Sequence, residues 1–227
     1  MDAIVFDMDG VLIDSEPVHR EVERRLFEDF GLPVDAEEHD QYMGTSAPDM
    51  FAAIAATHPE AWKTVGTTVD AMVREERARY AAALARGDVP VIHKAVAIAR
   101  RAHSAGLHIA VASSAPRSQI DTVLAQTGLD EIVSCIRSAD DVHHSKPDPE
   151  IYRATTACLG VPAARCWVIE DSEHGVSAAV AAGMRCIAYR NPSSGSPDLS
   201  RAEFVCDSMT AVAEVCLPIS TSRETGR

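Results

Sequence analysis

Short apolar runs that end in polar clusters recur along the chain. They cover residues 3–6, 108–112, 132–136, 166–169, 185–189 and 204–206. From the second run onward, the segments between these runs have helical patterns, so the order strand, helix, strand repeats. This alternation predicts an α/β fold, a Rossmann-like doubly wound parallel sheet with helices over both faces.

One long segment interrupts the alternation. Residues 16–86 show helical patterns and no convincing strand, and Val22, Leu26 and Phe30 have the spacing of one helix face. We therefore predict an all-helical domain at 16–86 that is inserted into an α/β core.

The remaining boundaries follow from the same patterns. We predict that 1–15 and 87–217 form the core, and that the polar, aperiodic segment 218–227 is a flexible tail. One core helix is expected to begin at Pro116, with Ser114 or Ala115 as its N-cap, and to end at Gly128.

Composition narrows the range of partners. The chain has 21 Lys and Arg residues against 34 Asp and Glu, a net charge of −13, and no basic run, so nucleic acid is not an expected partner. A surface of this sign gives no long-range attraction to phosphorylated substrates. An anionic substrate would need local positive charge from a metal ion, a lysine or a helix N-terminus.

Targeting signals and cysteines favour a cytoplasmic location. No basic residue precedes the first apolar segment, and no apolar run reaches the roughly 18 residues of a membrane span, so neither export nor a membrane partner is indicated. The six cysteines form no C-x-x-C pair and lie mostly in apolar stretches. We predict that they are reduced, buried thiols.

The first strand is followed at once by two carboxylates, Asp7 and Asp9, and then by Gly10. In an open parallel sheet the ligand crevice lies beyond the carboxyl ends of the strands, so both side chains emerge where binding is expected. One carboxylate could hold a cation and attack phosphorus while the other transfers a proton. Taken alone, the same residues would also suit an ordinary solvated turn.

Other strand ends carry compatible groups. Ser113 and Ser114 follow the second core strand at a predicted helix N-terminus, which suits a phosphate, although a capping serine is the alternative. Lys146 follows the third strand and comes just before Pro147 and Pro149. The fourth strand ends in Glu170 and Asp171. Carboxylate oxygens are the ligands that Mg²⁺ prefers.

These segments resemble the motifs of a known family. In chain order they read DMDGVLIDSE, VASSAP, KPDPEIY and VIEDSEHGVSAAVAAGM. They are similar to the four motifs of the haloacid dehalogenase superfamily, in the branch with a helical cap inserted after the first motif. β-Phosphoglucomutase and the sugar-phosphate phosphatases belong to this branch, and the resemblance covers roughly residues 3–213.

The resemblance implies a role for each matching residue. Asp7 would attack phosphorus and become an aspartyl phosphate, while Asp9 would act as general acid and base. The hydroxyl of Ser113 and the backbone N–H of Ser114 would bind the phosphoryl group, and Lys146 would neutralise the charge of Asp7 and phosphate.

The resemblance also implies a Mg²⁺ cofactor. Its ligands would be the Asp7 carboxylate, the Asp9 backbone carbonyl and Asp171, with Glu170 contributing directly or through water. Such an ion would supply the local positive charge that the acidic surface lacks.

The helical insertion would then be a cap that closes over the site. His19 matches a position where relatives place a polar residue facing the catalytic aspartate, although it could also be a partly exposed helix residue. The expected specificity loop is 42–47, in which Gly44 matches a characteristic glycine. Ala47 stands where β-phosphoglucomutase has an arginine for a distal phosphate.

The sequence thus predicts a Mg²⁺-dependent phosphatase that acts on a small phosphomonoester, a sugar or polyol phosphate, through an aspartyl-phosphate intermediate. The alternative is a β-phosphoglucomutase-like phosphotransferase. A dehalogenase would need neither Asp9 nor a metal, and a purely binding role would require a motif residue to be misplaced in space. Neither the individual substrate nor the oligomeric state follows from the sequence.

Overall fold

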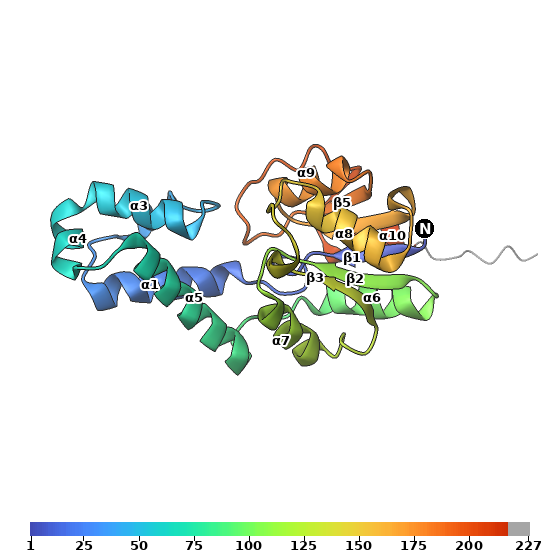
Figure 1. The fold of residues 1–227 in the computed structure, drawn as a ribbon, viewed down its shortest axis with the longest axis horizontal. Helices are drawn as coiled ribbons and strands as arrows, with labels where there is room; N and C mark the ends of the chain where they lie inside the picture. The colour runs from blue at the N-terminus through green and yellow to red at the C-terminus, as the bar shows by residue number, and fades with distance from the viewer. Residues whose placement is uncertain (218–227) are drawn as a thin grey trace, which may run out of the picture.

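The core of the protein is a parallel sheet of six strands in the order β3-β2-β1-β4-β5-β6. The computed structural model describes residues 1–217 (Figure 1). The strands are β1 (Ala3–Phe6), β2 (His108–Ala112), β3 (Val133–Arg137), β4 (Cys166–Glu170), β5 (Arg185–Tyr189) and β6 (Phe204–Cys206). Because β1 pairs with both β2 and β4, the strand order reverses beside β1. A switch point of this kind is where open α/β sheets bind ligands.

Helices cover both faces of the sheet, so the predicted doubly wound fold is confirmed. One face packs against α6 (His93–Ser104), α7 (Arg117–Thr127) and α10 (Met209–Cys216), and the other against α8 (Glu150–Leu159) and α9 (Glu173–Ala181). Ile4 and Phe6 point into the first layer, whereas Ala3 and Val5 point into the second. All four are buried because a strand alternates its side chains between two covered faces.

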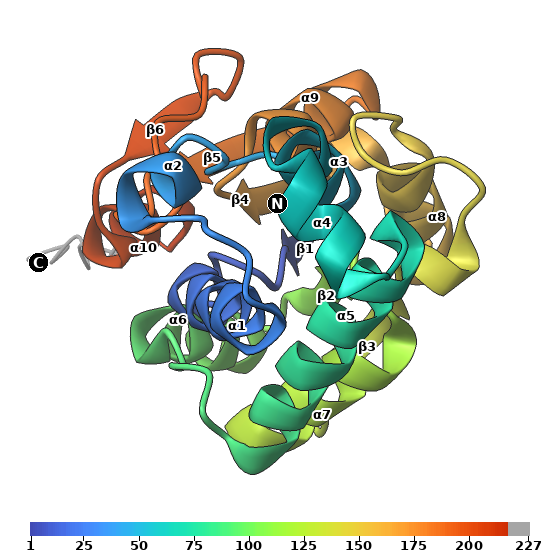
Figure 2. The ribbon, with the colours of Figure 1, turned by 90° about the vertical axis from the view of Figure 1, so that its left-hand side faces the viewer.

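A separate helical unit follows β1. It consists of α1 (Glu16–Phe30), α2 (Ala36–Asp40), α3 (Ala47–Thr57), α4 (Pro59–Val65) and α5 (Val69–Arg86). Its own apolar cluster includes Leu26, Phe51 and Ile54, which are fully buried. Figures 1 and 2 show the unit standing beyond one end of the sheet, with α1 and α5 leading back to the core. Gln126 of α7 donates to the carbonyl of Leu84 in α5 at 2.8 Å, which joins the two parts.

The start of α7 differs from the sequence-based prediction. The N-cap is Pro116 in an extended conformation, and the helix begins at Arg117, so the assignment of Ser114 or Ala115 as N-cap is wrong. The reason is local: Ala115 donates its N–H to the hydroxyl of Ser113, which holds the chain in a turn before the helix. The helix ends at Gly128 in the left-handed conformation, as predicted.

The prediction that every cysteine is a free thiol is wrong for one pair. Cys135 of β3 and Cys158 of α8 form a disulfide, with their Cα atoms 6.3 Å apart. The packing of α8 against β3 brings together two residues that are 23 positions apart, which spacing in the sequence does not reveal. The other four are buried thiols: Cys166, Cys186, Cys206 and Cys216.

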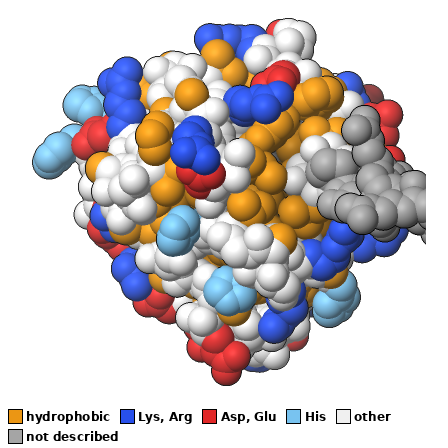
Figure 3. Space-filling view, turned by 90° about the vertical axis from the view of Figure 1, so that its right-hand side faces the viewer, with side chains coloured by type: hydrophobic (Ala, Val, Ile, Leu, Met, Phe, Trp, Pro, Cys, Tyr) orange, Lys and Arg blue, Asp and Glu red, His pale blue; other side chains and the backbone are white. Residues whose placement is uncertain are grey.

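Two surface observations bear on partners. On the described part of the face farthest from the helical unit, Lys and Arg side chains are scattered among Asp and Glu instead of forming one stripe (Figure 3). Within residues 1–217, no helix has both the length and the apolar character needed to cross a membrane. The predicted tail at 218–227 lies outside the described residues.

Candidate active site

Three buried carboxylates meet at the switch point of the sheet. Asp7 follows β1, and Glu170 and Asp171 stand at the end of β4, where the N–H of Asp7 donates to the carbonyl of Ile169 at 3.0 Å. Asp7 is 7% exposed, Asp171 6%, and Glu170 is fully buried. One oxygen of each lies within 4.8 Å of the others, which is close enough for all three to reach one ion.

Lys146 brings the positive charge to this group. Its Nζ donates to Asp7 Oδ1 at 2.6 Å, to Glu170 Oε1 at 2.7 Å and to the carbonyl of Ala112 at 3.1 Å. All three ammonium protons therefore have acceptors, one of them at the carboxyl end of β2. A buried ammonium so satisfied is held in one place between β2, β1 and β4.

Glu170 is fixed from several sides. It accepts hydrogen bonds from the Tyr152 hydroxyl at 2.9 Å and from the Ser172 hydroxyl and N–H at 3.0 and 3.1 Å. A Cβ on Gly175, in the first turn of α9, would overlap the Glu170 carboxylate. Only glycine lets the helix approach this closely, so the start of α9 holds Glu170 against Lys146.

The charges of this site do not balance. Burial raises the pKa of Asp7 well above its usual range, although Lys146 opposes the shift, and burial with the Glu170 charge raises the pKa of Asp171 to about 7. For Lys146, burial would lower the pKa, but Asp7 and Glu170 raise it well above its ordinary value. Three carboxylates thus face one ammonium, and a divalent cation with oxygen ligands, such as Mg²⁺, fits the excess negative charge.

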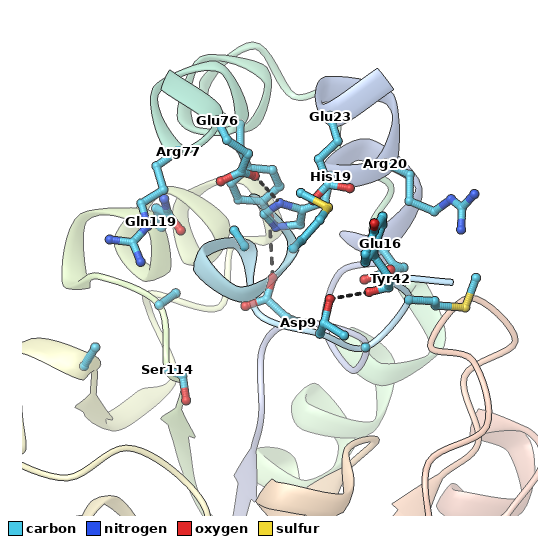
Figure 4. A pocket seen from close by; sticks show the side chains of 18 of the residues that line it. Asp9, Glu16, His19, Arg20, Glu23, Tyr42, Glu76, Arg77, Ser114 and Gln119 are labelled. Atoms are coloured by element: carbon cyan, nitrogen blue, oxygen red, sulfur yellow. Dashed lines mark hydrogen bonds and ion pairs between the residues drawn. The ribbon is translucent and has the colours of Figure 1, made fainter. Parts of the chain in front are cut away.

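Asp9 lies at the edge of the same site and faces the helical unit. The Tyr80 hydroxyl of α5 donates to Asp9 Oδ1 at 3.4 Å, and the Tyr80 ring stacks on His19 with ring centroids 3.7 Å apart. Figure 4 shows Asp9 and His19 in the same cavity. His19 Nδ1 in turn lies 2.7 Å from Oε1 of the buried Glu76. Burial would lower the pKa of His19, but Glu76 raises it overall, which favours the imidazolium.

The predicted phosphate-binding serines differ in exposure. Ser113 is buried, and its hydroxyl accepts the N–H of Ala115 at 3.0 Å, which leaves the hydroxyl proton for another acceptor. Ser114 is exposed and lines the cleft below α7 (Figure 4). Ser113, Ser114 and Lys146 also line one cavity with Asp7 and Asp9.

Two adjoining cavities connect this site to the helical unit. One, of about 720 Å³, contains the carboxylates and Lys146, and the other, of about 740 Å³, lies between the helical unit and the core. Asp9, Ser114 and Gly44 line both. Gly44 has a φ of +80°, a conformation that favours glycine, in the loop that reaches from the helical unit to the core. Ala47 lines the second cavity only.

The structure therefore brings the predicted site residues to one region, although their chemical roles stay predictions. Asp7, Lys146 and Glu170 are in direct contact, Asp171 adjoins them, and the others line the connected cavities. Sequence reasoning missed the residues that hydrogen-bond to these groups or to their neighbours, which come from both parts of the molecule: Glu76, Tyr80, Tyr152, Asn191 and Ser194. One signal was present, since the polar segment 190–197 follows β5 at the same edge of the sheet.

Comparisons with known proteins agree with this geometry. Residues 1–183 match a family model described as haloacid dehalogenase-like hydrolase. The phosphorylated carbohydrates phosphatase of Thermotoga maritima is 32% identical over 191 residues, which cover 82% of this chain and 84% of that protein. SUPPRESSOR OF QUENCHING 1, chloroplastic, of Arabidopsis thaliana is 35% identical over 190 residues, which cover 83% of this chain and only 18% of that longer protein. The crystal structure of CbbY from Rhodobacter sphaeroides in complex with phosphate has a TM-score of 0.75 and 27% identity, covering 93% of this chain and 96% of that one.

Proposed function

The chain belongs to the haloacid dehalogenase-like hydrolases, and we propose that it is a Mg²⁺-dependent phosphatase that hydrolyses a small sugar or polyol phosphate through a phosphorylated Asp7. The observation that carries the proposal is the buried group of Asp7, Lys146, Glu170 and Asp171 at the switch point of the sheet. The similarity to the phosphorylated carbohydrates phosphatase of Thermotoga maritima supports the substrate class.

The reaction has two steps. An oxygen of Asp7 attacks phosphorus, the bond from phosphorus to the leaving oxygen breaks, and Asp9 gives that oxygen its proton. Water then attacks the phosphoryl group and loses a proton to Asp9 as the bond to Asp7 breaks. Inorganic phosphate leaves, and both carboxyl groups return to their starting states.

The first step brings a dianion to a carboxylate, so positive charge is required. Lys146, 2.6 Å from Asp7, supplies part of it and stabilises charge on the equatorial oxygens. The residues that would hold Mg²⁺ are Asp7, Asp171 and the Asp9 carbonyl, with Glu170 direct or through water. When bound, the ion would offset the repulsion between Asp7 and the substrate and polarise the phosphoryl oxygens.

The helical unit, residues 16–86, acts in this proposal as a cap over the core formed by 1–15 and 87–217. Its cavity presents hydrogen-bonding groups from Glu16, His19 and Thr45, which suit a hydroxyl-rich leaving group. Glu16, Glu23 and Glu76 line that cavity together with Arg20 and Arg77, and Ala47 adds no charge. The loop 42–47 offers no cation to hold a second phosphate, so water is the proposed acceptor instead of another phosphorylated sugar. Arg77, which lines the cavity, is the group that would hold that phosphate in the phosphotransferase alternative.

Metal dependence tests the proposal directly. After dialysis against EDTA, release of phosphate from a panel of sugar and polyol monophosphates should fall to background and return when Mg²⁺ is added, because the carboxylate cluster needs a cation. EDTA already saturated with Mg²⁺ is the control. Full activity of the metal-free protein would contradict the proposal.

The acceptor is tested by the fate of β-glucose 1-phosphate with a trace of glucose 1,6-bisphosphate. We expect free phosphate from the best monoester to appear faster than glucose 6-phosphate, because the loop 42–47 has no cation to hold the second phosphate of a bisphosphate. Coupled assays for the two products measure both rates on one preparation. Faster formation of glucose 6-phosphate would establish the phosphotransferase alternative.

A further inference from the structure

The loop between β5 and β6 reaches the Asp171 carboxylate of the candidate site. In Figure 1 this orange-red loop extends from the core toward the helical unit. The hydroxyl of Ser194 in this loop donates to Asp171 Oδ2 at 2.6 Å. Among residues 1–217, this is the one side-chain hydrogen bond recorded for the Asp171 carboxylate.

The same loop also fixes the Gly10 backbone, which is the second neighbour of Asp171 Oδ2. Asn191 is buried, and its Nδ2 donates to the carbonyl of Gly10 at 3.0 Å. A Cβ on Gly10 would overlap Asp171 Oδ2, so the Gly10 backbone lies directly against that oxygen. Oδ2 is therefore confined between the Ser194 hydroxyl and Gly10, and one loop fixes both.

Further hydrogen bonds tie this loop to the segment after β1. Ser193 Oγ donates to Asp14 Oδ2 at 2.9 Å, and the Ser193 N–H donates to Asn191 Oδ1 at 2.9 Å. The position of Ser194 is thus set by contacts on the residues just before it. A donor fixed in this way can select one orientation of a carboxylate.

We propose that Ser194 is a positioning residue of the Mg²⁺ site, which raises metal affinity by holding Asp171 in the orientation that binds the ion. The proposal rests on the proposed function. With Oδ2 engaged by Ser194, the other carboxylate oxygen is left for the cation. Without the hydroxyl, the Asp171 side chain gains rotational freedom. Ordering it when the ion binds then makes the free energy of metal binding less favourable.

Direct measurement of Mg²⁺ affinity tests the proposal. In isothermal titration calorimetry on metal-free protein, Ser194→Ala should weaken Mg²⁺ binding by about 10- to 100-fold, the usual cost of losing a group that orients a ligand. Ser194→Thr keeps the hydroxyl and should have nearly the Mg²⁺ affinity of the wild type. Ser194→Val, which has the shape of Thr but no hydroxyl, should bind Mg²⁺ as weakly as Ser194→Ala. The Thr and Val pair keeps the comparison valid even if the Ala variant is unstable.

The matched control is Ser200→Ala, since Ser200 lies in the same loop, is exposed and lines neither of the two cavities described above. It should bind Mg²⁺ as the wild type does. In phosphate-release assays, Ser194→Ala should need more Mg²⁺ for half-maximal rate yet approach the wild-type maximum at saturation.

The outcomes separate this inference from the function on which it rests. Equal Mg²⁺ affinity of Ser194→Val and Ser194→Thr would overturn the role of Ser194 while leaving the phosphatase intact. A wild-type protein that binds no Mg²⁺ would overturn both. A wild-type protein that binds Mg²⁺, with the predicted loss in Ser194→Val, but releases phosphate from no monoester would overturn the proposed activity alone.

Discussion

Replacement of Asp7 by Asn should reduce phosphate release by roughly 10⁴- to 10⁶-fold, the range found when a catalytic nucleophile or its partner is removed. The amide keeps the volume of the side chain but cannot form the aspartyl phosphate. Steady-state assays at saturating Mg²⁺ measure the loss. Asp130→Asn, on an exposed residue whose side chain makes no hydrogen bond or ion pair within residues 1–217, is the matched control and should keep wild-type turnover.

Stability distinguishes this result from simple unfolding. Burial raises the pKa of Asp7 in the folded state, so its ionised form opposes folding at neutral pH, and this cost grows as pH rises through the folded pKa. Asp7→Asn removes that cost, while Lys146 keeps its ion pair with Glu170. The metal-free variant should therefore melt no lower than the wild type. Near wild-type phosphate release from a folded Asp7→Asn protein would rule out Asp7 as nucleophile.

The sheet could be predicted because its strands are covered on both faces. Such strands read as short apolar runs, and all six predicted runs coincide with strands to within one residue. The short helices α2 and α4 could not be predicted in the same way. They have 5 and 7 residues, which is too little for a 3.6-residue period to stand out.

The location of the candidate site could be predicted for a different reason. Asp7, Ser113 and Asp171 follow β1, β2 and β4, which are neighbours in the sheet, and parallel strands end at one edge of it. This reasoning gives a location but no pairing of side chains. The disulfide of Cys135 with Cys158 and the hydrogen bond of Ser194 to Asp171 depend on tertiary distances, which no local pattern contains.

His19 illustrates the same limit within the helical unit. Its position in the chain suggested a residue facing Asp9, and the two line one cavity, where the Tyr80 ring stacks on His19 and the Tyr80 hydroxyl donates to Asp9. Glu76 and Tyr80 are one helical turn apart on α5 and meet His19 from the same side. They contact His19 because α1 and α5 pack together, although His19 and Glu76 are 57 residues apart in the chain. The pairing of Glu76 with His19 therefore could not be predicted from either segment alone.

Replacement of Lys146 by Met should affect both stability and catalysis. Met fills a similar volume but leaves the buried carboxylates without their ammonium, and loss of one partner from a buried ion pair costs about 3–5 kcal/mol of unfolding free energy. Phosphate release should fall by roughly 100- to 1,000-fold, because a preorganised charge beside the reacting group is lost. Urea unfolding of metal-free protein measures the first effect, with the exposed Lys63→Met as control.

The pH dependence of the Lys146→Met variant identifies the cause of its instability. Without the ammonium, burial raises the pKa values of Asp7, Glu170 and Asp171 together, so the folded state binds protons more tightly than the unfolded chain. Groups of this kind lose their contribution to stability as pH rises through the folded pKa. The gap to the wild type should therefore be widest above about pH 7, the pKa of Asp171, and should narrow as lower pH protonates the cluster. Added Mg²⁺ should also narrow it, because a ligand of the folded state raises stability by mass action. A gap that is independent of both pH and Mg²⁺ would show that Lys146 acts by packing alone and not by its charge.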